Sequence, residues 1–124
     1  MSVQSTINRY LNKRKKWLIV NCPFCIFCLK EVTQSQINWG QVDLAHKIRK
    51  SETSKRYSRL ALQTMDKNTG LAHRDCHRVY DDKPALAVKL PGFWRVMNDV
   101  KEIDPDIYNK VMVNVYEPFL DNVP

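Results

Sequence analysis

The spacing of apolar residues predicts a helix at the start of the chain and strands after it. Val3, Ile7, Tyr10 and Leu11 recur with helical spacing. Residues 17–20 (Trp-Leu-Ile-Val) form a run of β-prone residues and predict a short strand. Residues 41–48 alternate between apolar and polar positions and predict a second strand. On that strand, we expect one face to carry Val42, Leu44, His46 and Ile48, and the other to carry Asp43, Ala45 and Lys47.

The second half of the sequence predicts helices. We expect them over about residues 71–81, 92–103 and 106–116. Asp104 and Pro105 suit the N-cap and the first position of the last helix. The apolar face of the middle helix is expected to hold Phe93, Val96, Met97 and Val100.

Composition and charge change this picture by indicating a partner. The chain has 124 residues, 44% of them hydrophobic, and a net charge of +7, which fits one domain and excludes collagen, coiled coil and wholesale disorder. Residues 1–60 carry 12 Lys+Arg and 3 Asp+Glu, a net of +9, whereas residues 61–124 carry 8 and 10, a net of −2. A basic half of a small protein favours a polyanionic partner such as nucleic acid.

No segment of the sequence is expected to cross a membrane. The longest apolar run, residues 17–29, is interrupted by Asn21 and Pro23 and is shorter than the ~20 residues of a spanning helix. The basic cluster before it gives the run a faint likeness to a secretory signal, but no small-x-small cleavage site follows. We therefore expect a cytoplasmic protein, in which clustered cysteines bind metal more often than they form disulfides.

Two short motifs predict a structural zinc site. Cys25 and Cys28 form one pair with two intervening residues, and His73 and Cys76 form another, 44 residues further on. Zinc takes four such ligands in a tetrahedron, and this spacing lets two ligands from one tight turn reach the same ion. Cys22 offers the same spacing to Cys25, so the first pair is ambiguous. We favour Cys25 and Cys28 because the residues after them continue readily as a turn.

Other interpretations of the cysteines stay open at this stage. Three cysteines in an apolar run are also compatible with burial in the hydrophobic core without any bound metal. Cys22, Cys25, Cys28 and the distant Cys76 are compatible with an iron–sulfur cluster, although position 32 is Val where the bacterial ferredoxin spacing has the fourth Cys. Disulfides fit least, since no secretory context is expected.

Three further polar residues have ordinary structural explanations when each is taken alone. His46 lies on the predicted strand, Asn68 lies in a turn, and His77 follows Cys76 on the predicted helix. Side chains of neighbouring helical residues diverge by ~100°, so His77 points away from a zinc ion bound by Cys76. Asp81 lies one turn further along the face of His77.

Taken in order, these residues resemble the HNH endonucleases, the ββα-metal nucleases with a zinc knuckle. The likeness runs through residues 25–28 (CIFC), 43–51 (DLAHKIRKS) and 67–81 (KNTGLAHRDCHRVYD), and it covers about residues 22–83. The resemblance implies an α+β fold: a small ββα-metal core with a structural zinc, flanked by N- and C-terminal helices. It also implies hydrolysis of phosphodiester bonds in DNA, by nicking or cutting.

The resemblance implies a role for each matched residue. His46 is expected to be the general base that activates a water, and Asn68 to hold the hairpin and orient that base. His77 is expected to ligate a single divalent cation, Mg²⁺ or a transition metal, bound to the scissile phosphate. Small free-standing members of the family are often encoded by phages or mobile elements, which implies a host cytoplasm if this chain is phage-encoded.

The sequence departs from the family pattern at two positions. One Cys of the second zinc motif is His73, which zinc accepts as a Cys₃His set. The residue before the base, acidic in many members, is Ala45. Asp43 and Asp81 are the candidates to supply the missing carboxylate. If neither does, the alternative is a degenerate zinc-stapled module that binds DNA or a protein without cleaving.

The sequence thus predicts three regions. Residues 1–16 form a basic helix, residues 17–83 the zinc-knuckle core, and residues 84–124 a helical extension that packs on the core or on a protein partner. DNA is the expected partner, with RNA also open. The residues expected to grip phosphates without reading sequence are Lys13, Arg14, Lys15, Lys16, Lys47, Arg49 and Lys50.

Overall fold

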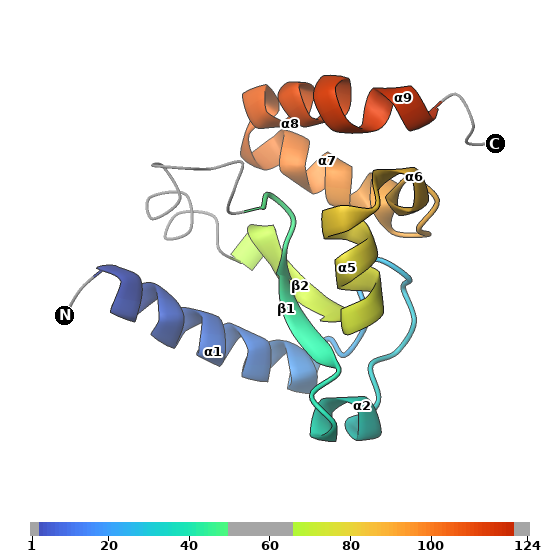
Figure 1. Ribbon diagram of the computed structural model, residues 1–124. Helices are drawn as coiled ribbons and strands as arrows, with labels where there is room; N and C mark the ends of the chain where they lie inside the picture. Colours follow the sequence, from blue (N-terminus) through green and yellow to red (C-terminus); the bar gives the residue numbers. More distant parts are fainter. Residues whose placement is uncertain (1–2, 50–65, 121–124) are drawn as a thin grey trace.

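A two-stranded antiparallel hairpin lies between helices at the centre of the protein (Figure 1). The structure, a computed structural model, describes residues 3–49 and 66–120. The predicted α+β class is confirmed, with helix as the main component. The elements in chain order are α1 (Val3–Asn21), α2 (Gln34–Asn38), β1 (Val42–His46), β2 (Thr69–His73), α5 (Arg74–Asp82), α6 (Pro84–Ala87), α7 (Phe93–Ile103), α8 (Pro105–Val111), the π-helical turn η2 (Met112–Tyr116) and α9 (Glu117–Leu120).

The hairpin pairs β1 with β2 in a fixed register and leads directly into α5. Val42 lies opposite His73, Leu44 opposite Leu71, and His46 opposite Thr69. The prediction of a helix starting at residue 71 is therefore wrong for its first turn, which is strand. Leu71 pairs with β1 and is buried, so pairing and burial override the helical spacing of this segment.

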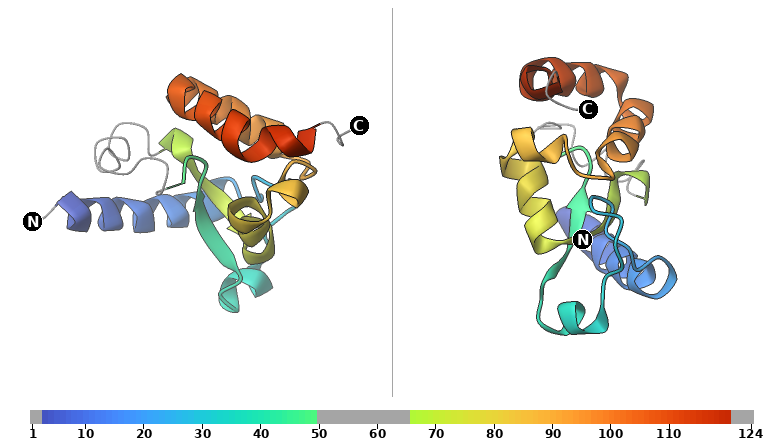
Figure 2. Two further views of the ribbon diagram at one scale, coloured as in Figure 1. Left: turned by 45° about the horizontal axis from the view of Figure 1, so that its top comes forward. Right: turned by 90° about the vertical axis from the view of Figure 1, so that its right-hand side faces the viewer.

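Helix α1 is longer than the sequence pattern suggests. It continues through residues 17–20, which the β-prone composition assigned to a strand, so that prediction is wrong. The segment contains no Gly or Pro before Pro23, where a helix cannot continue with full hydrogen bonding. Ile7 and Leu18 are both buried and lie about 20° apart around the helix axis, so one face of α1 packs inward. Figure 2 shows α1 and α5 on different sides of the hairpin.

The helices after α5 follow the predictions closely. Helix α7 buries Phe93, Val96, Met97 and Val100, the four residues expected on its inner face. The side chain of Asp104 caps α8 by accepting hydrogen bonds from the N–H groups of residues 106 and 107, and Pro105 takes the first helical position. The predicted helix 106–116 is α8 followed by a π-helical turn.

The buried core joins the cysteine-rich segment to α5 and α7. The Phe27 ring stacks on Tyr80 at 4.6 Å between centroids, and the Phe93 ring meets Tyr116 edge-on at 4.9 Å.

The strict alternation predicted for β1 is wrong, because Val42 and Ala45 are buried while Leu44 and His46 are only half-buried. Helices cover the hairpin on more than one side, so neither face of β1 is simply the solvent face.

Gly92 offers a test of how α7 is attached to the rest of the core. Its N–H donates to the Phe27 carbonyl at 2.7 Å, and a Cβ at this position would lie 2.0 Å from the Ile26 carbonyl oxygen. We expect Gly92→Ala to lower the free energy of unfolding by about 3 kcal/mol through overpacking, because the added Cβ meets backbone atoms. Gly40→Ala is the matched control: φ there is +67° with open space around the Cα, so only about 1 kcal/mol of backbone strain is expected. Urea unfolding of the zinc-loaded protein measures the free energy of unfolding of each variant. Equal losses of stability in the two variants contradict the close packing of Gly92 against the backbone of Ile26.

Candidate metal centre and histidine–carboxylate cluster

Cys25 and Cys28 lie on a tight turn that presents both sulfur atoms to the same point. The Leu29 N–H donates to the Cys25 carbonyl at 2.9 Å, and the Cys28 N–H points at the Cys25 sulfur at 3.5 Å. Leu29 adopts φ +65°, a conformation rarely used by residues other than Gly, Asn and Asp. The turn therefore places both thiols where one metal ion could meet them.

The turn meets the junction of β2 and α5 in a four-ligand cluster. One ligand atom from each of Cys25, Cys28, His73 and Cys76 lies within 4.8 Å of the others, so this cluster could hold a metal ion. A tetrahedral zinc site with bonds of about 2.3 Å needs sulfur atoms about 3.8 Å apart, and small side-chain movements close that gap. The predicted ligand set is therefore brought together. Cys22 is exposed and lies outside the cluster, which removes the ambiguity of the first motif.

The electrostatics of the cluster favour a bound cation. Burial, followed by the neighbouring thiols of Cys25 and Cys28, raises the pKa of Cys76 to about 12. Zinc reverses this effect because it neutralises the crowded thiolates. Three thiols and one imidazole are a common zinc set. The iron–sulfur alternative required Cys22, which does not reach the cluster.

Gln36 fixes the orientation of the histidine ligand. His73 Nδ1 lies 3.3 Å from the Cys28 sulfur and therefore faces the cluster. Its Nε2 lies 3.1 Å from Gln36 Oε1, so Nε2–H donates to that oxygen when Nδ1 binds metal. The same Gln36 oxygen accepts the Thr33 N–H at 2.9 Å in a capping box at the start of α2. The sequence signal for Gln36 was this Thr-x-x-Gln box, but nothing in the sequence linked the box to the zinc site.

A second cluster surrounds His77 on the next position of α5. Its Nδ1 lies 3.1 Å from Asp43 Oδ2, and its Nε2 lies 3.1 Å from Asp81 Oδ2. Arg74 Nη2 also donates to Asp43, at 3.0 Å from Oδ1. Both carboxylates proposed from the sequence thus contact His77, and one of them comes from a strand remote in sequence.

The two carboxylates control the charge of His77. The hydrogen bond that His77 donates to Asp81 is the largest cause that raises the pKa of His77 to about 9; burial opposes this effect and Asp43 adds to it. Burial acts to raise the pKa of Asp43, but hydrogen bonds from Arg74 and His77 outweigh it and hold the pKa below its ordinary value. The three groups therefore form an ion-paired cluster around neutral pH in the absence of a bound cation.

The geometry does not let both carboxylates bind one ion together with His77 as the side chains stand. Asp43 and Asp81 occupy opposite nitrogens of the ring, and within the described part of the chain only the Cys₃His cluster gathers three or more ligand atoms. A cation at one nitrogen leaves the other carboxylate as a hydrogen-bond partner of the ring. Asp43 and Asp81 therefore remain alternative candidates for the carboxylate ligand that the sequence lacks at position 45.

Asn68 connects the two strands of the hairpin at their open end. Its side chain is 2% exposed and bonds both backbone groups of Ile48: Oδ1 accepts the N–H at 2.7 Å and Nδ2 donates to the carbonyl at 3.3 Å. The Asn68 carbonyl accepts the Lys47 N–H at 2.8 Å. Asn68 therefore holds the hairpin, as expected. His46 ends β1 beside these bonds and is half-buried, and its role as a base stays a prediction.

Three of the basic residues expected to grip phosphates have structural contacts. Lys47 is 11% exposed and its Nζ lies 2.7 Å from Asp99 on α7. Arg49 donates to the Asp81 carbonyl at 3.1 Å, near the end of α5. Arg14 donates to the Asp66 carbonyl at 2.9 Å and so ties α1 to the start of β2. These contacts place the three cations in the packing between elements.

The remaining basic residues have a different environment. Lys13 and Lys16 are exposed and Lys15 is half-buried on α1. Lys50 lies outside the described residues.

None of the helices that the structure describes is long and apolar enough to span a membrane.

Comparison with known proteins gives one partial match. The Myb-like DNA-binding domain family matches residues 20–67, less than half of the chain. The matched range contains Cys25, Cys28 and His46 and ends before β2 and α5. No curated protein and no solved structure matches the chain.

The cluster of Cys25, Cys28, His73 and Cys76 predicts one zinc per chain. We expect Cys76→Ser to lose the metal and to unfold at lower temperature, because a missing ligand removes binding free energy that contributes to folding. Cys22→Ser is the matched control and should retain one zinc, since Cys22 lies outside the cluster. Elemental analysis of the purified proteins measures the metal content. Full zinc in Cys76→Ser, or loss in Cys22→Ser, contradicts this ligand set.

The His77 cluster predicts a pH dependence of stability. Its pKa of about 9 exceeds the unfolded value near 6.5, so the cluster stabilises the fold fully below pH 6.5 and loses this contribution as the pH rises through about 9. NMR titration of the His77 ring in the zinc-loaded protein, without other divalent ions, measures the pKa. Asp81→Asn should lower it more than Asp43→Asn, because Asp81 is the largest cause. An ordinary pKa in the unmodified protein refutes the cluster.

Proposed function

We propose that this chain is a DNA-binding, metal-dependent endonuclease of the HNH type, which hydrolyses phosphodiester bonds next to His77. The observation that carries the proposal is the placement of His77 between Asp43 and Asp81, on a helix that directly follows a β-hairpin. This placement compensates for the absence of an acidic residue at position 45, since the carboxylates of Asp43 and Asp81 reach His77. The same hairpin and helix are joined by the Cys₃His cluster, as a zinc-knuckle nuclease requires.

The residues around His77 fit a divalent cation with few protein ligands. Mg²⁺ is commonly bound by one or two carboxylates together with substrate phosphate and water. Asp81 is the more exposed carboxylate, at 36% against 23% for Asp43, whose two oxygens already pair with Arg74 and His77. We therefore assign Nε2 of His77 and Asp81 to the cation, and Asp43 to holding the ring through Nδ1–H. When bound, the cation offsets the negative charge that builds on the phosphate and on the leaving oxygen.

The other two matched residues complete the proposed site. His46 takes a proton from the attacking water, for which a neutral imidazole is suited near pH 7. Asn68 ties the end of β1 to the start of β2 and so fixes where His46 sits on the hairpin. Arg49, bound to the Asp81 carbonyl, positions the end of α5 against the same segment.

DNA as the partner is supported by charge and by the partial family match. The N-terminal half carries a net charge of +9, and Lys13 and Lys16 lie exposed on α1. Cations of this kind bind the phosphate backbone without reading sequence. The family that matches residues 20–67 is described as a DNA-binding domain.

A second candidate function is DNA binding without cleavage. Two observations favour it: the family match concerns binding alone, and Ala45 is fully buried with no group that could ligate an ion. In this case the zinc cluster acts as a staple for a binding surface, and the ion-paired His77 cluster is structural. The two candidates differ in one measurable property, metal-dependent cleavage.

Plasmid nicking distinguishes these candidates. We expect zinc-loaded protein to relax supercoiled plasmid when Mg²⁺, Mn²⁺ or Ni²⁺ is added. His77→Ala and Asp81→Asn should abolish nicking, and His46→Ala should lower the rate by about 10²–10⁴-fold. Asp43→Asn should raise the metal concentration for half-maximal rate by about 10–100-fold, because it orients a ligand.

Asp82→Asn is the matched control, since Asp82 is the exposed neighbour of Asp81 on the same helix. It should nick like the unmodified protein. Unchanged nicking in His46→Ala refutes the assigned base. Salt-sensitive plasmid binding with no nicking in any of the three metals selects the binding module instead.

A further inference from the structure

A hollow of about 610 Å³ lies beside the zinc cluster, on the side of the molecule that carries α2 and the first turns of α5. Its lining includes the candidate metal ligands His73 and Cys76, Gln36 of α2 and Trp39, which directly follows α2. This hollow is separate from the contacts around His77, but Arg74 joins them: it lines the hollow and also donates to Asp43 at 3.0 Å.

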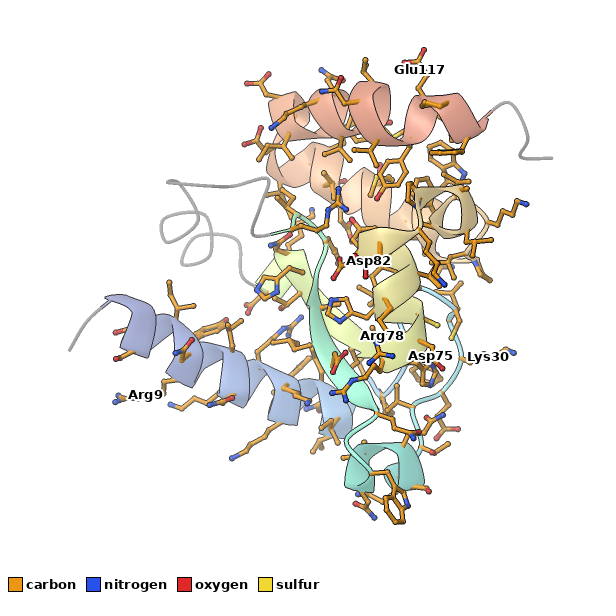
Figure 3. All side chains as sticks on the ribbon, viewed as in Figure 1. Arg9, Lys30, Asp75, Arg78, Asp82 and Glu117 are labelled. Carbon is orange, nitrogen blue, oxygen red and sulfur yellow. The ribbon has the colours of Figure 1, made fainter. Side chains whose placement is uncertain are left out.

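Cations dominate the charged lining of the hollow. Lys30, Arg74 and Arg78 contribute positive charge, and Asp75 contributes the negative one. Figure 3 shows Asp75 and Arg78 on α5 and Lys30 on the segment that passes beside that helix. Arg74 and Arg78 lie one helical turn apart, with about 5–6 Å between their Cβ atoms. A row of cations that starts at the candidate catalytic cluster and follows α5 is suited to the phosphates of one strand.

An exposed tryptophan, Trp39, lines the same hollow as these cations. Trp39 is 80% exposed, although a tryptophan normally buries much of its large apolar surface. Its backbone is held, since its N–H donates to the Ser35 carbonyl at 3.0 Å at the end of α2. Helix α2 is in turn anchored to the zinc ligand His73 through Gln36. The backbone of Trp39 is therefore held in place while its indole ring is open to solvent in a hollow that cations also line.

We propose that Trp39 stacks on an unpaired nucleobase of a strand whose phosphates contact Arg74 and Arg78. Stacking on an exposed aromatic beside a basic groove is the general means of binding single-stranded nucleic acid. The bases of an intact duplex already stack on one another and cannot offer a face to the indole. The inference rests on the proposed nucleic-acid function and narrows its substrate to DNA or RNA with an unpaired region near the cleavage site.

Binding of short labelled oligonucleotides tests this inference. The zinc-loaded protein, with no other divalent ion, is titrated by fluorescence anisotropy with a DNA single strand, its duplex and the RNA strand of the same sequence. Trp39→Ala should weaken single-strand binding by about five- to 150-fold and duplex binding little. Trp39→Phe should retain most of the affinity, because a phenyl ring still stacks. Arg78→Ala should reduce the salt dependence of binding by about one phosphate contact.

Trp94→Ala is the matched control, since Trp94 is half exposed on α7, away from the lining of the hollow. It should leave binding unchanged. Comparable losses of DNA-strand and RNA-strand affinity in Trp39→Ala support stacking that does not depend on the sugar. A loss of affinity for one of these strands alone identifies that strand as the ligand.

Single-strand affinity unchanged in Trp39→Ala, or equal losses on strand and duplex, overturns the stacking inference even if the protein binds or nicks DNA. The proposed nuclease can fail separately, because this assay contains no ion that supports cleavage. If the protein has no affinity for any of the three oligonucleotides and instead binds a protein through Trp39, both the stacking inference and the proposed nuclease are overturned.

Discussion

The structure depends on one cluster of four side chains that could hold a metal ion. Cys25 and Cys28 lie on a turn after α1, and His73 and Cys76 lie where β2 becomes α5. The three thiols are crowded together, Cys25 is buried and Cys28 and Cys76 are half-buried, and burial and this crowding raise the pKa of Cys76. A divalent metal held there would link segments far apart in sequence, which suits a domain with a small core.

The position of α5 follows from this link, and both candidate sites depend on α5. Cys76 faces the metal cluster, while His77, one residue later, faces Asp43 on β1. The two neighbours point in different directions because successive helical side chains diverge by about 100°. Arg74 precedes them and faces Asp43 as well as the hollow beside Trp39. One short helix thus presents a structural site, a candidate catalytic site and a charged surface.

Contacts from outside the hairpin hold this arrangement in place. Gln36 aligns the ligand His73, and Arg49 binds the carbonyl of Asp81. Lys47 joins β1 to Asp99 of α7. Lys47 and Arg49, which the sequence places in a basic surface, thus fix elements to one another, whereas Lys13 and Lys16 on α1 are exposed.

The sequence by itself determined the features that depend on local chemistry: the Cys₃His ligand set, the cap at Asp104, the inner face of α7 and the pairing of Asp81 with His77 one turn apart. It could not determine what depends on distant contacts. The strand at Leu71 and the helix over residues 17–20 were assigned wrongly, because pairing with β1 and packing of α1 override local propensity. The approach of Asp43 to His77, and the exposure of Trp39, arise only when the folded chain brings remote segments together.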